Sequence, residues 1–298
     1  MTQNTADLAR AFTWTGSKQT YYTIRLMVDR DLVADCYRAY GYFRWADDIV
    51  DAAASAEAVA SVEAVASVEA VASGDAAASD DILSQSDDER VSFIRRQKEL
   101  INRQYKNDRT NDLTPQEEMV ADLIGHDRGE NSLLQSYIRN FLAIIEFDAY
   151  RRGRLISQAE LTWYSKCLGK ATTDGILYFI GNGFPYPTGR GRYLGATAAH
   201  ITHMLRDMLE DTADGYINIP HEYLEAHGIG PEDVDSPAFR AWVQHRVELA
   251  REYLREGKCY LEGVGVLRCK LAGYWYCARY EGVLDTIERD GYILRAEY

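Results

Sequence analysis

The sequence predicts an all-α protein, and three observations support this prediction. Long segments lack proline and repeat apolar residues at three- and four-residue steps, which is the spacing of one helix face. Two segments open with helix-start signals: Thr114 precedes Pro115, and Ser157 lies three residues before Glu160, as in a capping box. No segment of the sequence shows the two-residue alternation of a half-buried strand. A single helical domain is therefore expected over residues 1–298.

The expected helices can be placed in order along the chain. Asp29 and Asp31 open the helix of residues 31–50, because carboxylates favour the positive end of a helix dipole. Glycine and proline in residues 181–187 predict a loop. The segment 133–150 is rich in apolar side chains and is expected to be central. The predicted helices span residues 6–16 (a short helix or arm), 31–50, 91–105, 115–123, 133–150, 158–180, 193–211, 239–260 and 266–289.

One segment interrupts this pattern. Residues 56–61 read Ala-Glu-Ala-Val-Ala-Ser, and this unit recurs almost unchanged at 62–67 and 68–73. A six-residue period fits neither a helical face nor a solenoid unit. Residues 52–90 are therefore interpreted as a low-complexity insertion, disordered or loosely helical, outside the catalytic core.

Composition excludes several classes of function. The net charge of −13 argues against a nucleic-acid-binding surface and against electrostatic attachment to anionic lipid. No apolar run approaches the ~20 residues that cross a bilayer, and residues 1–10 lack a signal-peptide core. The five cysteines are odd in number and include no Cys-x-x-Cys pair, which indicates reduced thiols. A cytoplasmic protein is expected, in transient peripheral contact with membranes if its substrates are lipids.

The first motif ends the helix of residues 31–50. Tyr40, Arg44, Asp47 and Asp51 share one helix face, with Asp48 beside them. Like charges at this spacing repel, so local helix stability does not explain them, whereas a bound divalent cation does. Tyr40 has two interpretations: it closes a ligand pocket, or it packs in the core.

The second motif repeats the arrangement. His200, His203, Asp207 and Asp211 line one face of a predicted helix, and Arg206 and Glu210 flank it. Mg²⁺ takes oxygen ligands, commonly one or two carboxylates plus substrate phosphates, and arginine grips phosphate oxygens with paired N–H groups. If the two helices face each other, the motifs predict a site for a Mg²⁺-bound diphosphate. The alternative is two solvated helix faces, because the chain has 46 acidic residues.

At these residues the chain resembles the squalene/phytoene synthase family. The likeness lies in Arg44-x-x-Asp47-Asp48-x-x-Asp51 and in Arg206-Asp207-x-x-Glu210-Asp211, followed by residues 215–220. The resemblance implies an isoprenoid-synthase-type helical bundle with a central cavity, and three Mg²⁺ ions bound with a diphosphate. The implied metal ligands are Asp47, Asp48, Asp51, Asp207, Glu210 and Asp211. The implied diphosphate and substrate contacts are Ser17, Lys18, Thr20, Tyr21, Tyr40, Arg44, His203 and Arg206.

The resemblance also implies an activity. Ionisation of a farnesyl or geranylgeranyl diphosphate gives an allylic cation that alkylates a second prenyl diphosphate head to head. Two alternatives stay open: a terpene cyclase that ionises a single prenyl diphosphate, and a non-catalytic family relative acting as an assembly factor. No glycine-rich dinucleotide motif is present, which disfavours a reductive step with NADPH.

The chain departs from the family at several positions. His200 and His203 stand where members commonly carry Gln and Asn. Imidazole is a poor ligand for a hard ion such as Mg²⁺, so His203 is expected to donate a hydrogen bond to a diphosphate oxygen; the alternative is that both rings fill space. Residues 169–173 replace the usual Ala-Gly-Ser-Val-Gly, and Phe147 stands in place of a tyrosine. These departures concern the second substrate site and leave the residues of the metal site in place.

Overall fold

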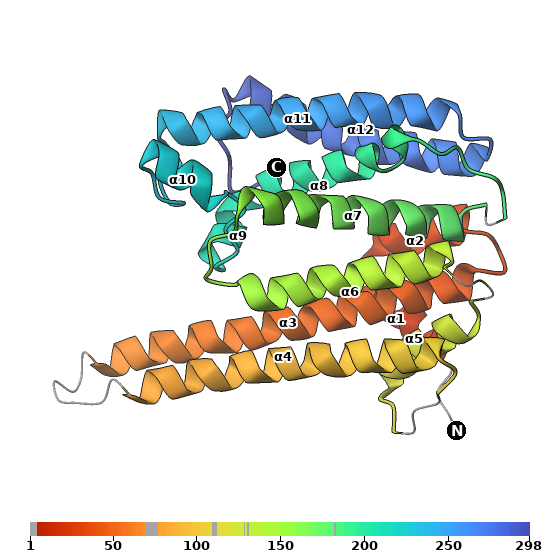
Figure 1. Cartoon of the computed structure of the whole chain (residues 1–298), viewed down its shortest axis with the longest axis horizontal. Helices are drawn as coiled ribbons and strands as arrows, with labels where there is room; N and C mark the ends of the chain where they lie inside the picture. Colours follow the sequence, from red (N-terminus) through yellow and green to blue (C-terminus); the bar gives the residue numbers. More distant parts are fainter. Residues whose placement is uncertain (1–4, 69–76, 109–111, 128, 130, 182) are drawn as a thin grey trace. The chain divides into compact units, whose positions relative to one another are not determined.

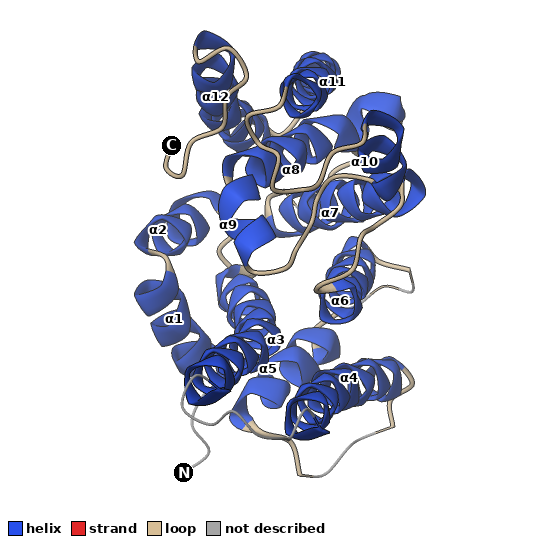
Figure 2. Cartoon of the chain, turned by 90° about the vertical axis from the view of Figure 1, so that its left-hand side faces the viewer, coloured by secondary structure: helices blue, strands red, loops and turns tan. Residues whose placement is uncertain are grey.

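All regular secondary structure in the part of the chain that the computed structural model describes is helical. That part comprises residues 5–68, 77–108, 112–127, 129, 131–181 and 183–298. For residues 51–68 and 77–88 it describes the backbone alone. Figure 1 traces the helices and Figure 2 shows them joined by loops, without a strand among the described residues. The all-α prediction is confirmed. The helices are α1 (Thr5–Gly16), α2 (Lys18–Met27), α3 (Val33–Val68), α4 (Ala77–Tyr105), α5 (Pro115–Gly125), α6 (Leu133–Arg151), α7 (Gln158–Phe179), the 3₁₀ helix η1 (Arg190–Tyr193), α8 (Leu194–Arg206), α9 (Met208–Ala213), α10 (His221–His227), α11 (Pro237–Glu262) and α12 (Leu267–Arg289).

Two boundaries of the expected helices lie far from their predicted positions, and α2 and α10 were not predicted as helices. The helix expected to end at Val50 continues as α3 to Val68, and α4 begins at Ala77, well before the expected residue 91. Ala is the commonest residue of the repeat, with 7 of the 18 residues in 56–73, and Ala is the strongest helix former even without an apolar face. The insertion is therefore helical on both sides of residues 69–76, which lie outside the described residues.

The helix expected over 193–211 is also interrupted. α8 ends at Arg206 and α9 starts at Met208, with Asp207 between them at φ −97° and ψ 3°. The amide of Asp207 still donates to the carbonyl of His203 at 3.0 Å, and the amide of Asp211 to the carbonyl of Asp207 at 2.8 Å. The second motif therefore spans a bend and not one straight helix.

The described residues group into two compact units. Unit 1 contains residues 1–21, 37–126 and 145–150, and unit 2 contains 22–36, 127–144 and 151–298. The single domain expected over residues 1–298 stays a prediction. Among the residues that the structure describes, no helix offers an apolar stretch of bilayer-spanning length.

Unit 1 is organised around α5, against which α1 and α4 pack. Thr114 is the N-cap of α5, as the Thr114–Pro115 pair predicts, and it forms a capping box in which Thr114 and Glu117 bond to each other's backbone amides. Glu117 is buried and also accepts from Arg96 at 2.6 and 2.7 Å and from Gln97 at 3.0 Å. The buried phenol of Tyr42 on α3 donates to Gln97 at 3.0 Å. One carboxylate thus links α3, α4 and α5.

Unit 2 is organised around α8, which packs on α7, α11 and α12. Both views place α8 between α7 and α11 (Figures 1 and 2). Glycine permits the close approach: a Cβ on Gly257 of α11 would lie 2.5 Å from the amide nitrogen of Gly195, and one on Gly169 of α7 would lie 2.1 Å from the Thr197 hydroxyl. Small residues at these crossings fix the position of α8.

Glu117 provides a test of unit 1. Burial acts to raise the pKa of Glu117, but the hydrogen bonds from Arg96, the Thr114 amide and Gln97 outweigh it and lower that pKa to about 2. Since the folded pKa lies below the ordinary 4.5, the ionised carboxylate stabilises the fold above pH 4.5, and this contribution is lost as the pH falls toward 2.

Glu117→Gln is expected to lower the free energy of unfolding by about 1–3 kcal/mol at pH 7. The difference from the parent should shrink as the pH falls from 4.5 toward 2. Urea unfolding followed by circular dichroism at several pH values measures the free energy of unfolding of the parent and the variant. Glu118→Gln, in the same helical turn, is the control. A loss independent of pH would contradict the role of the charge.

Candidate active site

The first motif lies on α3 in unit 1 and presents its charges to solvent. Arg44 Nη2 lies 2.7 Å from Asp48 Oδ1, and Arg44 Nη1 lies 4.0 Å from Asp47 Oδ2. All three side chains are about half exposed, at 50%, 47% and 50% for Arg44, Asp48 and Asp47. Desolvation acts against the charge of Arg44, but the two carboxylates outweigh it and raise its pKa. Asp51 continues α3, and its side chain lies outside the described residues.

The opposite face of α3 explains this orientation. Tyr42, Phe43, Ala46 and Val50 are each 6% exposed or less. Because these residues anchor the helix in unit 1, the positions three and four apart around Arg44 must turn outward. The periodicity that predicted the helix therefore also predicts which side carries the charges.

The Ser17 segment lies in unit 1 with the first motif. Ser17 accepts from the Thr20 amide at 3.2 Å and from its hydroxyl at 2.9 Å, so both residues contribute to the start of α2. The Lys18 ammonium lies 5.6 Å from the centre of the Trp14 ring. Tyr21 is buried, and its ring stacks on Tyr37 at 5.5 Å. Capping and packing occupy these side chains, and their contacts to a diphosphate stay a prediction.

Tyr40 connects the segment to the motif. A Cβ added at Gly16 would lie 3.7 Å from the Tyr40 hydroxyl, so the turn between α1 and α2 passes close to this phenol. Tyr40 is only partly buried and stands one helical turn before Arg44. Within unit 1 the structure therefore places the Ser17 turn, Tyr40 and Arg44 along one side of α3.

The second motif lies at the bend between α8 and α9 in unit 2. Arg206 pairs with Asp207 through two bonds, Nε to Oδ1 at 2.5 Å and Nη2 to Oδ2 at 2.7 Å. Its Nη2 also lies 2.7 Å from His203 Nε2, while His203 Nδ1 lies 3.4 Å from Asp207 Oδ2. The hydrogen bond with Asp207 is the main cause that raises the pKa of Arg206. Glu210 is exposed on α9.

Asp211 is supported by a chain of polar groups that the sequence did not reveal. Asn218 Nδ2 donates to Asp211 Oδ2 at 2.9 Å, and Asn218 Oδ1 accepts from Arg151 Nη1 at 2.8 Å. Arg151 is buried, with its guanidinium 4.8 Å from the Tyr164 ring and 5.2 Å from the Tyr216 ring. Only one signal pointed here: an asparagine in the segment after the second motif.

The chemistry of the donor set suits Mg²⁺. The motif side chains offer carboxylate oxygens, which hard cations prefer, and those described are at least partly exposed. Among the described residues, no three His, Cys, Asp or Glu side chains are grouped closely enough to hold a metal ion by themselves.

A sequence profile of the squalene/phytoene synthase family matches residues 15–297. The chain belongs to this family. A phytoene synthase of Thermus thermophilus is 34% identical over 145 residues, which are 47% of this chain and 48% of that protein, so the chain matches about half of the relative's length. The squalene synthase HpnC of Alicyclobacillus acidocaldarius has the same fold, with a TM-score of 0.67 at 19% identity, covering 98% of this chain and 95% of that one. A dehydrosqualene synthase, whose crystal structure was determined in complex with a ligand, also has this fold. Its TM-score is 0.65 at 15% identity, and the match covers 98% of this chain and 89% of that one.

The squalene/phytoene synthase fold confirms the expected isoprenoid-synthase-type bundle, and two departures from the family pattern contact each other. His200 Nε2 lies 3.0 Å from the Thr172 hydroxyl, which belongs to the altered segment 169–173. Burial, with a smaller effect of His203, lowers the pKa of His200 to about 3. A neutral imidazole bonded to a hydroxyl thus joins α7 to α8 beside the second motif.

His203 differs from His200 in its contacts. Desolvation is the main effect that lowers the pKa of His203; Arg206 and Arg279 act in the same direction, and Asp207 acts against them. Its ring stays close to Arg206 and Asp207 at once. His203 is thus placed within the charged group of the second motif, whereas His200 is tied to α7.

Asn218→Ala tests the support of Asp211. Removal of the amide leaves the buried Arg151 without this acceptor and Asp211 without this donor, so we expect a loss of about 1–3 kcal/mol in the free energy of unfolding. If Asp211 is a Mg²⁺ ligand, as the sequence predicts, the Mg²⁺ concentration for half-maximal activity should also rise. Thermal unfolding and a Mg²⁺ titration measure the two effects, with Thr212→Ala as the nearby control. An unchanged melting temperature and Mg²⁺ response would show that the chain of bonds is dispensable.

Proposed function

We propose that this protein is a Mg²⁺-dependent prenyltransferase that condenses two prenyl diphosphates head to head, with farnesyl or geranylgeranyl diphosphate as substrate. The observation that carries the proposal is the pairing of each acidic motif with its own arginine on an accessible helix face. Family membership and the isoprenoid-synthase-type fold support it.

Each acidic motif has a defined part in this proposal. Mg²⁺ would be held by carboxylates of the two motifs, and when bound it neutralises the charge of the departing diphosphate. The proposed ligands are Asp47, Asp48 and Asp51 of the first motif and Asp207, Glu210 and Asp211 of the second.

Arg44 and Arg206 would bind diphosphate oxygens, with Lys18 as a further cation. Arg44 is now paired with half-exposed carboxylates, and exposed ion pairs contribute only about 0–1 kcal/mol. Such a pair opens at little cost when an anion of higher charge arrives. Arg206 and Asp207 are less exposed, at 26% and 23%, so this pair is expected to keep its geometry while Arg206 turns its remaining N–H groups to the ligand.

Aspartate replacements test the motifs. Asp47→Asn and Asp207→Asn are each expected to lower turnover more than about 100-fold, because metal binding provides several kcal/mol of transition-state stabilisation. The protein should stay folded by circular dichroism. Purified protein is incubated with farnesyl or geranylgeranyl diphosphate, with and without Mg²⁺ and NADPH, and the organic extract is identified by mass spectrometry. Normal product formation by either variant would remove the metal-site proposal, and a cyclised product from a single substrate would replace condensation by cyclisation.

His203 is proposed to donate a hydrogen bond to a diphosphate oxygen. His203→Ala should then raise the KM for the prenyl diphosphate about tenfold, the effect of losing one hydrogen bond to a charged group, with a smaller change in kcat. His203→Asn retains an N–H donor and should stay near the parent. Initial-rate kinetics separate the two constants. Equal KM values in the parent and His203→Ala would leave space-filling as the role of the ring.

A further inference from the structure

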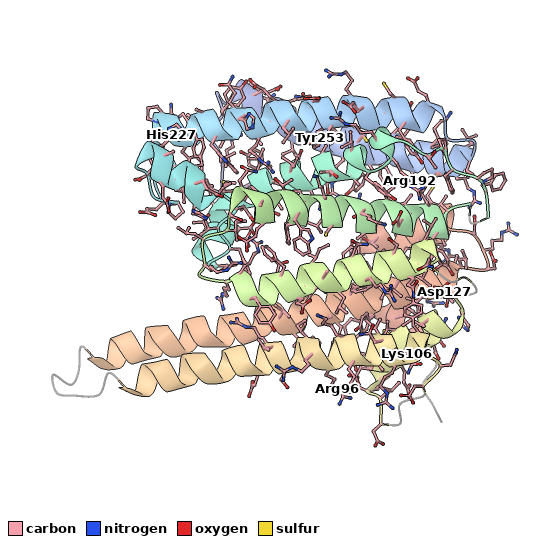
Figure 3. All side chains as sticks on the ribbon, viewed as in Figure 1. Arg96, Lys106, Asp127, Arg192, His227 and Tyr253 are labelled. Atoms are coloured by element: carbon pink, nitrogen blue, oxygen red, sulfur yellow. The ribbon has the colours of Figure 1, made fainter. Side chains whose placement is uncertain are left out.

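Unit 2 contains a hollow that no residue of the two acidic motifs lines. We call it the basic groove: a cavity of about 820 Å³ lined by residues of α7, η1, α8, α10 and α11. On α8 its wall includes Thr197 and Ile201, whereas the second motif uses His200, His203 and the residues that follow. Tyr253, labelled on α11 in Figure 3, lines the same groove. The basic groove is therefore distinct from the second motif.

The charge of the basic groove is opposite to that of the chain. The protein has 46 acidic and 33 basic residues, yet the described residues that line the groove include no Asp or Glu. Its cationic lining residues are Lys166, Lys170, Arg190 and Arg246. A concentration of one sign in a concave site raises the local concentration of the opposite ion.

Arg246 provides the main evidence that the basic groove binds an anion. It is only 7% exposed, and within the described part of the chain it makes no ion pair or hydrogen bond; its guanidinium lies 5.6 Å from the Trp242 ring. Burial lowers the pKa of Arg246 to about 10, so it remains a cation at neutral pH. A buried charge without an anionic partner destabilises a fold, whereas a bound anion would compensate it.

The other cations differ in availability. Lys166 is exposed and reaches no carboxylate among the described residues, and Arg190 is 78% exposed, 3.9 Å from Glu256. Lys170 pairs with the buried Asp174 at 2.6 Å, which Arg192 shares at 3.3 Å, so two cations meet one carboxylate. This cluster retains a positive charge.

The remaining wall is aromatic and aliphatic. Trp242, Tyr253 and Tyr223 line the basic groove together with Leu194, Ile201 and Leu249. Such a surface binds an apolar or planar group, while the cations bind its charged end. The combination selects an anion attached to an apolar body, because a small inorganic anion would leave this wall unused.

We propose that the basic groove binds an organic phosphate, whose anionic group pairs with Arg246 and Lys166 and whose apolar part lies against Trp242. This chemistry has two sources, a free phosphate ester with a hydrocarbon chain and the headgroup of an anionic phospholipid. The proposal does not depend on the reaction of the two acidic motifs.

Titration calorimetry with EDTA present tests it, using geranyl monophosphate, dihexanoyl phosphatidic acid and inorganic phosphate. An organic probe should bind the full-length parent more tightly than inorganic phosphate. Arg246→Gln should weaken that binding about tenfold or more, and Lys166→Gln should weaken it by a smaller factor. Arg255→Gln, an exposed arginine of the same helix outside the groove, is the matched control and should bind as the parent does.

The outcomes separate the alternatives. Tighter binding of geranyl monophosphate identifies the free ester, and tighter binding of phosphatidic acid identifies the lipid headgroup. Arg206→Gln should keep the binding, which distinguishes this groove from the proposed diphosphate site. Equal affinity in the parent, Arg246→Gln and Lys166→Gln would overturn the proposal, and so would loss of binding in Arg206→Gln. The proposal is also overturned if neither organic probe binds at 10 mM, roughly the weakest affinity such a site would have. Lys166→Gln keeps the test decisive if Arg246→Gln fails to fold, because Lys166 is exposed.

Discussion

The close crossing of α7 and α11 over α8 is the constraint on which unit 2 depends. Gly257 and Gly195 meet where α11 crosses α8, and Gly169 meets Thr197 where α7 does. With its neighbours this near, α8 has little freedom to rotate or slide. One rigid helix then serves two purposes: its C-terminal end carries the second motif, and its Thr197 side forms part of the basic groove. A side chain at Gly257 or Gly169 would disturb both.

Burial and exposure are divided consistently between the helices of the two motifs. α3 buries Tyr42, Phe43 and Val50 and leaves Arg44 half exposed. α8 buries Ile201, Met204 and Leu205 and leaves His203 exposed. In both, apolar packing fixes the backbone. The ion pairs differ: those of Arg44 are half exposed and weak, whereas Arg206 holds Asp207 through two hydrogen bonds.

Much of this could be predicted from the sequence, for reasons that differ between elements. Apolar spacing identified α6 and α7. The Thr114–Pro115 pair and the capping box at Ser157 identified two helix starts, because these signals depend on neighbouring residues. The bend at Asp207 was missed since the spacing of His200, His203, Asp207 and Asp211 suits a continuous helix. The extension of α3 to Val68 was missed because the repeat lacks an apolar face. The bond between Arg151 and Asn218 joins residues 67 positions apart, a separation that no local sequence pattern encodes.

The link from Arg151 through Asn218 to Asp211 has a consequence for how the protein loses its function on heating. Asp211 lies on the short helix α9, which by itself is too brief to be stable. Arg151 at the end of α6 holds Asp211 in position through Asn218. The stability of the second motif therefore depends on a helix end that is distant in the sequence. Helix ends open more readily than the cores they flank. The motif is therefore expected to come apart in a local, reversible opening below the temperature at which α7, α8 and α11 separate, and inactivation and melting become two different events.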